Sequence, residues 1–209
     1  MAKIESLFAT AVFQTALAVA GGRALLRSLD TSCRAIAEAD RAGQAWCAAN
    51  NYRGYTSYAS LDDLAWRDPA FAELVRHLDG HVAEFSRALD HDLAGRRLVC
   101  DSLWVNILEP GGFHTAHIHP HSVISGTVYV AVPKGASAIR FEDPRLAMLM
   151  AAPPKRASAK RANRTFVDVA PEPGTVLLWE SFLRHEVPVN AAKAERISIS
   201  FNYALKAPI

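Results

Sequence analysis

Cysteine is scarce in this chain, and its spacing excludes one common architecture. The 209 residues contain only three cysteines, Cys33, Cys47 and Cys100, and no two of them form a C-x-x-C pair. An odd number of widely spaced thiols argues against a disulfide framework and suits a reducing compartment. We therefore expect a cytoplasmic protein.

Long hydrophobic runs are also missing. The apolar stretch Val12 to Ala20 is shorter than the about 20 residues that a helix needs to cross a bilayer. The start of the chain carries Lys3 and Glu5, and its apolar positions are interrupted by Thr and Gln, which makes a poor signal peptide. We therefore expect a soluble protein with no membrane partner.

An excess of one charge sign is absent as well. Lysine and arginine total 23 and aspartate and glutamate 21, so the formal net charge is +2. Nucleic-acid-binding proteins usually show a concentrated basic face. One basic run, Lys155 to Arg164, lies among Ala, Ser and Asn and is typical of a solvated loop. The sequence therefore carries no strong nucleic-acid signal.

The first part of the chain is predicted to be mainly helical. Half of all residues are hydrophobic, so residues 1–209 can bury the core of a single domain. Within it, residues 1–95 are expected to form an N-terminal strand, over Leu7–Leu17, and a helical annex. Helical periodicity runs over Arg23–Cys47 and again over Asp68–Leu89, where the Asp-Pro pair supplies an N-cap and a first-turn proline.

The second part of the chain, residues 96–209, has the period of two that is typical of β-strands. Pro- and Gly-rich turns separate the segments, and no helical pattern lies between them. This arrangement predicts a mainly β fold with N-terminal helices, a double-stranded β-helix or jelly roll, with the helices outside one sheet. Eight strands are expected: Leu98–Leu108, His117–His119, Thr127–Val132, Ala138–Phe141, Arg164–Val169, Thr175–Trp179, His185–Val187 and Arg196–Tyr203.

A group of histidines points to a metal site. His117 and His119 lie two apart on a predicted strand and therefore face the same side, and His185 lies on a later strand. His114 has the opposite parity and is a weaker ligand candidate, whereas the direction of His121 is uncertain because a proline precedes it. Imidazole suits iron, zinc, copper and nickel alike, so the ligands alone do not name the metal.

An arginine on the last predicted strand extends this hypothesis. Alternation over residues 196–203 places Arg196 and Ser198 on one face with further polar groups, and the apolar residues on the other. Such a polar face is also what a solvated strand would show. The alternative is that Arg196 binds a carboxylate bidentately, with a hydrogen bond from the Ser198 hydroxyl.

With these residues, the chain resembles the Fe(II)- and 2-oxoglutarate-dependent oxygenases, which fold as a double-stranded β-helix. Within them it is most similar to a family of largely uncharacterised oxygenases. The resemblance covers most of the chain and is strongest from Trp104 to Tyr203. It is carried by residues 7–10, Trp104-Val105-Asn106, His117-Ile118-His119-Pro120-His121-Ser122, residues 125–130, residues 141–145, residues 173–176, His185-Glu186-Val187-Pro188 and residues 196–202.

The resemblance implies a role for each candidate residue and three small-molecule partners: Fe(II), 2-oxoglutarate as cosubstrate, and O2. The family usually supplies His-x-Asp or His-x-Glu and a distant histidine, and here His119 stands where the carboxylate would be. The implied metal ligands are His117, His119 and His185. The implied cosubstrate-binding residues are Arg196, Ser198, Asn106, Tyr129 and Ser125.

The function expected from this resemblance is hydroxylation of a substrate C–H group, with release of succinate and CO2. Two other functions fit the same histidines. One is a cupin-like, three-histidine metal dioxygenase of the thiol dioxygenase type, which uses no 2-oxoglutarate. The other is a non-catalytic module with a structural metal. The primary substrate cannot be read from the sequence, and a homodimer is left open.

Overall fold

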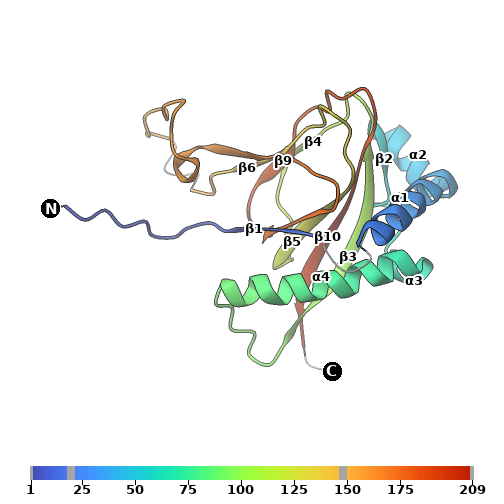
Figure 1. The fold of residues 1–209 in the computed structure, drawn as a ribbon, viewed down its shortest axis with the longest axis horizontal. Helices are drawn as coiled ribbons and strands as arrows, with labels where there is room; N and C mark the ends of the chain where they lie inside the picture. The colour runs from blue at the N-terminus through green and yellow to red at the C-terminus, as the bar shows by residue number, and fades with distance from the viewer. Residues whose placement is uncertain (1, 18–21, 146–149, 208–209) are drawn as a thin grey trace.

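The computed structural model describes residues 2–17, 22–145 and 150–207, and it contains two antiparallel sheets (Figure 1). The six-stranded sheet has the order β1-β8-β5-β10-β3-β2, and the four-stranded sheet has the order β4-β9-β6-β7. The strands are β1 Val12–Ala16, β2 Gly54–Thr56, β3 Arg97–Leu108, β4 His114–His117, β5 Ile124–Ala131, β6 Ile139–Glu142, β7 Phe166–Val169, β8 Thr175–Glu180, β9 His185–Val187 and β10 Arg196–Lys206.

The two sheets form the jelly roll that the sequence predicts. From β4 to β10 the chain passes back and forth between the sheets, so strands distant in sequence become neighbours. A core cluster between the sheets joins Leu177 and Trp179 of β8 to Ile139 and Phe141 of β6. The helices pack on the other face of the six-stranded sheet, as expected, where they share a larger core with Ile197, Ile199, Phe201 and Tyr203 of β10.

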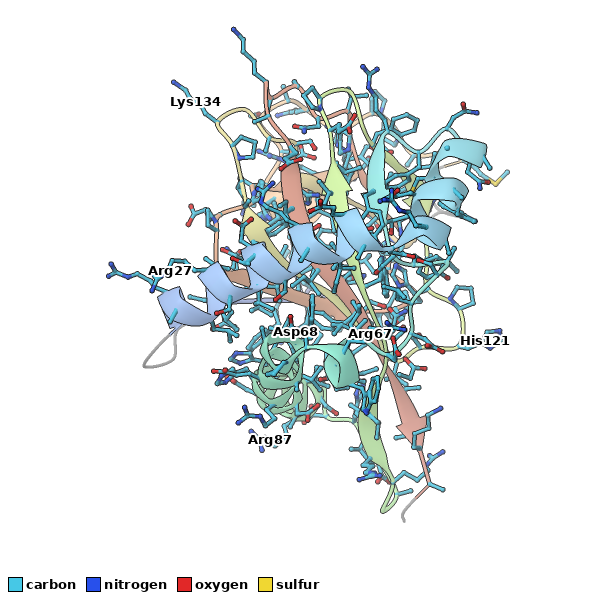
Figure 2. The ribbon with its side chains drawn as sticks, turned by 90° about the vertical axis from the view of Figure 1, so that its right-hand side faces the viewer. Arg27, Arg67, Asp68, Arg87, His121 and Lys134 are labelled. Carbon is cyan, nitrogen blue, oxygen red and sulfur yellow. The ribbon has the colours of Figure 1, made fainter. Side chains whose placement is uncertain are left out.

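The helical annex contains α1 Gly22–Ala39, α2 Arg41–Ala49, α3 Leu64–Arg67 and α4 Pro69–Ala88. The predicted helix Arg23–Cys47 is wrong as a single element, because it ends at Ala39 and restarts after Asp40, whose side chain accepts a hydrogen bond from Gly43 N. Asp68 caps α4 as predicted, by accepting from Ala70 N. It also accepts a 2.6 Å hydrogen bond from Ser32 of α1 and lies between the two helices (Figure 2).

The predicted strands agree with the structure except near the histidines and at the start of the chain. The prediction of a strand over His117–His119 is wrong: the strand is β4, His114–His117, and His119 follows its end. The N-terminal strand is shorter than expected and pairs with β8 at the edge of the main sheet. Sequence periodicity misses β2, which pairs with β3.

The basic run and the helices can both be placed in the fold. The basic run Lys155 to Arg164 lies in the long connection between β6 and β7, and its charged residues are exposed. In the described part of the chain no helix has both the length and the apolar character needed to cross a membrane.

The packing of β5 against β10 yields a stability prediction. A Cβ at Gly126 would lie 2.6 Å from the Leu177 carbonyl oxygen and would also collide with the Phe201 ring. We expect Gly126→Ala to lower the free energy of unfolding by about 2 kcal/mol through overpacking.

Gly80→Ala on α4 is the matched control, because no atom beyond the neighbouring turns of its own helix lies within 4 Å of the added methyl group. It should raise the free energy of unfolding by roughly 0.5–1 kcal/mol, the helix propensity difference. Urea unfolding of both variants measures the two effects, and equal values would contradict this account of the β5–β10 contact.

Candidate metal centre and carboxylate pocket

Three histidine side chains converge on one point between the sheets. His117 ends β4 and pairs with His185, the first residue of β9. His119 is held two residues beyond the strand by a 3.0 Å hydrogen bond from its backbone N–H to the Ser181 carbonyl. One ring nitrogen from each histidine lies within 4.8 Å of the others, which is close enough for all three to bind a single ion.

Hydrogen bonds determine which nitrogen each ring presents. Nδ1 of His117 lies 2.6 Å from the Thr115 carbonyl oxygen, and Nδ1 of His185 lies 2.9 Å from the Leu183 carbonyl oxygen. Because a carbonyl oxygen only accepts, each Nδ1 carries the hydrogen. Nε2 is therefore the atom that can bind a metal in both rings.

The third ring is oriented by a side chain. Nδ1 of His119 lies 2.6 Å from Oδ1 of Asn202, and Nε2 of His119 is buried without a partner in the described residues. Asn202 is held in turn, because its Nδ2 donates to Ser102 Oγ at 3.0 Å and Ser125 Oγ donates to its Oδ1 at 2.8 Å. Ser125 therefore holds Asn202 behind the His119 ring and is not among the residues that line the cavity.

Burial keeps two of these rings neutral near neutral pH. Burial first, and then the neighbouring His117, lower the pKa of His185 to about 3. Burial also lowers the pKa of His119, although the hydrogen bond to Asn202 opposes the shift. Their Nε2 lone pairs are thus available to a cation without prior loss of a proton.

A buried arginine without a counter-charge lies in the same cavity. Arg196, at the start of β10, is only 2% exposed, and its Nε and Nη1 atoms have no hydrogen-bond partner in the described residues. Its guanidinium carbon lies 4.9 Å from the centre of the Tyr129 ring, within cation–π range. The Tyr129 hydroxyl is likewise buried without a partner, and burial raises its pKa, so it remains a donor.

The cavity has a volume of roughly 640 Å³, and β10 contributes one wall. The strand alternates as the sequence predicts, but its polar face lines the cavity and is not solvated: Arg196, Ser198, Ser200 and Asn202 all lie on this wall. Asn106 also lines the cavity, opposite Ser198 in the β3–β10 register. Its amide is already occupied, since Thr56 Oγ1 donates to it at 2.9 Å and it donates to Ser200 Oγ at 3.1 Å.

The two remaining histidines of the cluster lie outside the group of three. Between β4 and β9 a bulge sets His114 opposite Val187 and His117 opposite His185, so four residues on one strand match three on the other. The parity argument for His114 is therefore wrong, because it lines the same cavity as His117. His121 has a left-handed backbone, with φ of 70°, and its side chain points outward (Figure 2).

Sequence reasoning missed several of the residues that line the cavity. Tyr52, between α2 and β2, places its hydroxyl 2.7 Å from Nε2 of His114. Trp104 of β3 lies beside His119, with ring centres 5.8 Å apart. Burial first, and then the charge of Arg196, lower the pKa of His114 to about 3. Tyr52 lies in an irregular connection, where no periodicity could have identified it.

Solved structures with the same fold come from several oxygenases. A prolyl-4-hydroxylase from Pseudomonas putida is 17% identical, with 95% of this chain and 94% of that chain covered and a TM-score of 0.61. The carbocyclase SnoK from nogalamycin biosynthesis is 12% identical, with 95% and 80% covered and a TM-score of 0.65. HygX from Streptomyces hygroscopicus, solved with nickel and 2-oxoglutarate, is 14% identical, with 94% and 82% covered and a TM-score of 0.59.

The strands that carry the cavity also match a sequence family. Residues 102–202 fit the family described as "Putative 2OG-Fe(II) oxygenase", and this range contains the three histidines and Arg196. No curated protein matches the chain. At these identities the solved structures show the fold, and the family match adds the kind of enzyme. Residues 102–202 thus match the 2OG-Fe(II) oxygenase family, whose members are oxidoreductases that depend on Fe(II), 2-oxoglutarate and O2.

Proposed function

We propose that this protein is an Fe(II)- and 2-oxoglutarate-dependent dioxygenase that hydroxylates a C–H group of its primary substrate. The observation that supports this most strongly is the unpaired guanidinium of Arg196 in the same cavity as three convergent imidazoles. A buried charge without a partner is costly, and a carboxylate from a ligand would supply the missing partner.

The metal would bind to Nε2 of His117, His119 and His185. These nitrogens fit a divalent cation, since each ring has its Nδ1 hydrogen bonded to an oxygen and its Nε2 directed elsewhere. A structural zinc site normally has four protein ligands. No fourth side chain joins the group within the described residues, which favours a site that is open to a cosubstrate.

The cosubstrate would bind through Arg196. Its planar guanidinium can donate two parallel hydrogen bonds to the distal carboxylate of 2-oxoglutarate. Ser198 lies two residues after Arg196 on the same face of β10 and lines the cavity. Tyr129 lies opposite Ser198 on the neighbouring strand β5. Both hydroxyls can therefore add hydrogen bonds to that carboxylate. Asn106 would shape the pocket wall without binding the carboxylate, because its amide is already engaged.

The chemistry itself would be supplied by the bound metal, which couples oxidative decarboxylation of 2-oxoglutarate to succinate and CO2 with transfer of one oxygen atom of O2 to the substrate. The chain's own residues would bind and orient the metal, the cosubstrate and the substrate, and they would exclude water from the site. No Asp or Glu side chain is among the cavity-lining residues that the structure describes, so the protein contributes no carboxylate acid or base at the reacting atoms.

A three-histidine thiol dioxygenase is the second candidate, and one observation favours it. His119 replaces the carboxylate that the oxygenases usually place in the metal centre, which gives the all-imidazole ligand set of thiol dioxygenases. That enzyme would take up O2 with a small thiol and would ignore 2-oxoglutarate. Binding of 2-oxoglutarate therefore separates the two functions.

The first prediction concerns the cosubstrate. Anaerobic protein with Fe(II) should develop a weak visible charge-transfer band when 2-oxoglutarate is added. Arg196→Ala should raise the Kd from this titration at least ~30-fold, the effect expected when one partner of a buried charge pair is removed. Arg87 is an exposed residue of α4, and Arg87→Ala should leave the Kd unchanged. The absence of both the band and succinate formation under air would argue against the proposed function.

The second prediction concerns the metal ligands. Alanine at His117, His119 or His185 should weaken Co(II) binding by more than about 100-fold, because each change removes a ligand and not merely its supporting hydrogen bond. His121→Ala is the control, since this residue does not join the cluster. Co(II) absorption titrations measure the effect. Wild-type affinity in the His119 variant would exclude it from the ligand set.

The third prediction concerns the side chain behind His119. Asn202→Val removes the oxygen that accepts from His119 Nδ1 and should weaken Co(II) binding roughly 10-fold. Asn202→Asp keeps an acceptor in the same place and should restore the affinity. If the two variants bind Co(II) equally well, the hydrogen bond does not orient the ring.

A further inference from the structure

We propose that the primary substrate has a flat, apolar body and an anionic group, and that residues outside the metal centre recognise both parts. This inference rests on the proposed function, because it assigns the substrate side of the same cavity. It is carried by two rows of aromatic rings, by the charge of the lining residues and by the position of Arg53.

The first aromatic row leads from the surface to His119. Tyr58, which is 64% exposed, makes an edge-to-face contact with Trp104 at 5.2 Å between ring centres. Trp104 is 8% exposed and lies 5.8 Å from the ring of His119. An apolar molecule that follows these rings would reach the point where the three histidines converge.

The second row leads to His114 from another part of the surface. Trp46, on α2, is 37% exposed and lies 6.5 Å from the ring of Tyr52, which lies 5.7 Å from the ring of His114. Both rows line the same cavity, together with the exposed apolar side chains of Phe113 and Ile118. Aromatic walls of this kind favour planar apolar groups over flexible polar chains.

The charge of the cavity selects the polar part of the substrate. Among its described lining residues are two arginines and four histidines but no aspartate or glutamate. Arg196 is assigned to 2-oxoglutarate, which leaves Arg53 for the substrate. Arg53 is exposed and forms no ion pair with a carboxylate among the described residues, and the nearby Glu109 lines an adjoining pocket and not this cavity. A cavity lined by cations and no acids attracts anions and repels amines.

Arg53 lies against the turn between β3 and β4. A Cβ on Gly111 would lie 3.0 Å from Nη1 of Arg53, and one on Gly112 would lie 2.6 Å from the Arg53 carbonyl oxygen. The two glycines therefore leave room for this arginine to lie against the turn. Gly111 also has a φ of +86°, a conformation that other residues rarely adopt. Arg53 thus contacts this turn and also lines the cavity.

Four of these recognition residues come from a segment outside the family match. Trp46, Tyr52, Arg53 and Tyr58 all precede residue 102, where the match begins. The matched range contains the proposed metal and cosubstrate residues together with Trp104, and this N-terminal segment adds Arg53 and most of the aromatic rings on the substrate side. The substrate class must therefore be inferred from these side chains themselves.

The test uses three matched probes: 4-phenylbutyrate, 4-phenylbutanamide and 4-phenylbutylamine. The full chain is loaded with Ni(II) and saturating 2-oxoglutarate, so that Arg196 is occupied and no turnover takes place. Ligand-observed NMR titrations should then show the butyrate binding about 10-fold more tightly than the amide, the effect of one charge-assisted hydrogen bond, with the amine weakest.

Variants assign this selectivity to residues. Arg53→Gln should reduce the butyrate-to-amide ratio to about one, whereas Arg41→Gln, an exposed arginine of α2 outside the cavity lining, should preserve it. Tyr58→Ala should weaken all three probes by a similar factor. Trp66→Ala is its control, because this exposed aromatic residue does not line the cavity.

Each remaining outcome counts against one hypothesis. If 2-oxoglutarate does not bind the nickel protein, the proposed function fails. If it binds but the amine binds as tightly as the butyrate, or if none of the probes binds at millimolar concentration, the substrate assignment is wrong. The assignment is equally wrong if Arg53→Gln leaves the butyrate-to-amide ratio unchanged.

Discussion

The structure depends on holding the Arg196 guanidinium in a buried position without a protein carboxylate. Arg196 lies at the start of β10, opposite Leu108 of β3, and β10 is a central strand that pairs with β3 on one side and β5 on the other. The Tyr129 ring offsets part of the desolvation by contact with the cation. In the proposed function, the remaining cost would be relieved when the carboxylate of 2-oxoglutarate binds. The fold would then gain affinity for a carboxylate at the expense of stability.

The parts of the fold and site that could be predicted are those governed by local periodicity. Alternation along residues 196–203 correctly separated the Arg196 face from the apolar face, although sequence alone could not tell a solvated face from a buried cavity wall. The same reasoning gave most strands to within a few residues. It recognised the first two of the three convergent histidines as a pair and the third by its place on a later strand.

The predictions that were wrong concern residues whose positions depend on pairing with another strand and not on local periodicity. His117 and His119 do converge, but not because they alternate on one strand; β4 ends at His117, and a hydrogen bond to the Ser181 carbonyl holds His119. His114 was placed on the wrong face because a β-bulge depends on the partner strand, which the sequence of β4 does not specify. Tyr52 and Arg53 reach the cavity from an irregular connection, where no repeating pattern exists to detect them.

A histidine in place of the usual carboxylate would change the charge of the proposed metal site. Three imidazole ligands would leave the full charge of a divalent ion uncompensated, and Arg196 adds another positive charge to the same cavity. A dianion such as 2-oxoglutarate would then bring the charge that a protein carboxylate would otherwise have supplied in part. An imidazole ligand must also be held in one tautomer, a requirement that a carboxylate does not have. The Asn202 amide, fixed by Ser102 and Ser125, meets that requirement for His119, which gives the polar network behind this ring a role in the proposed site.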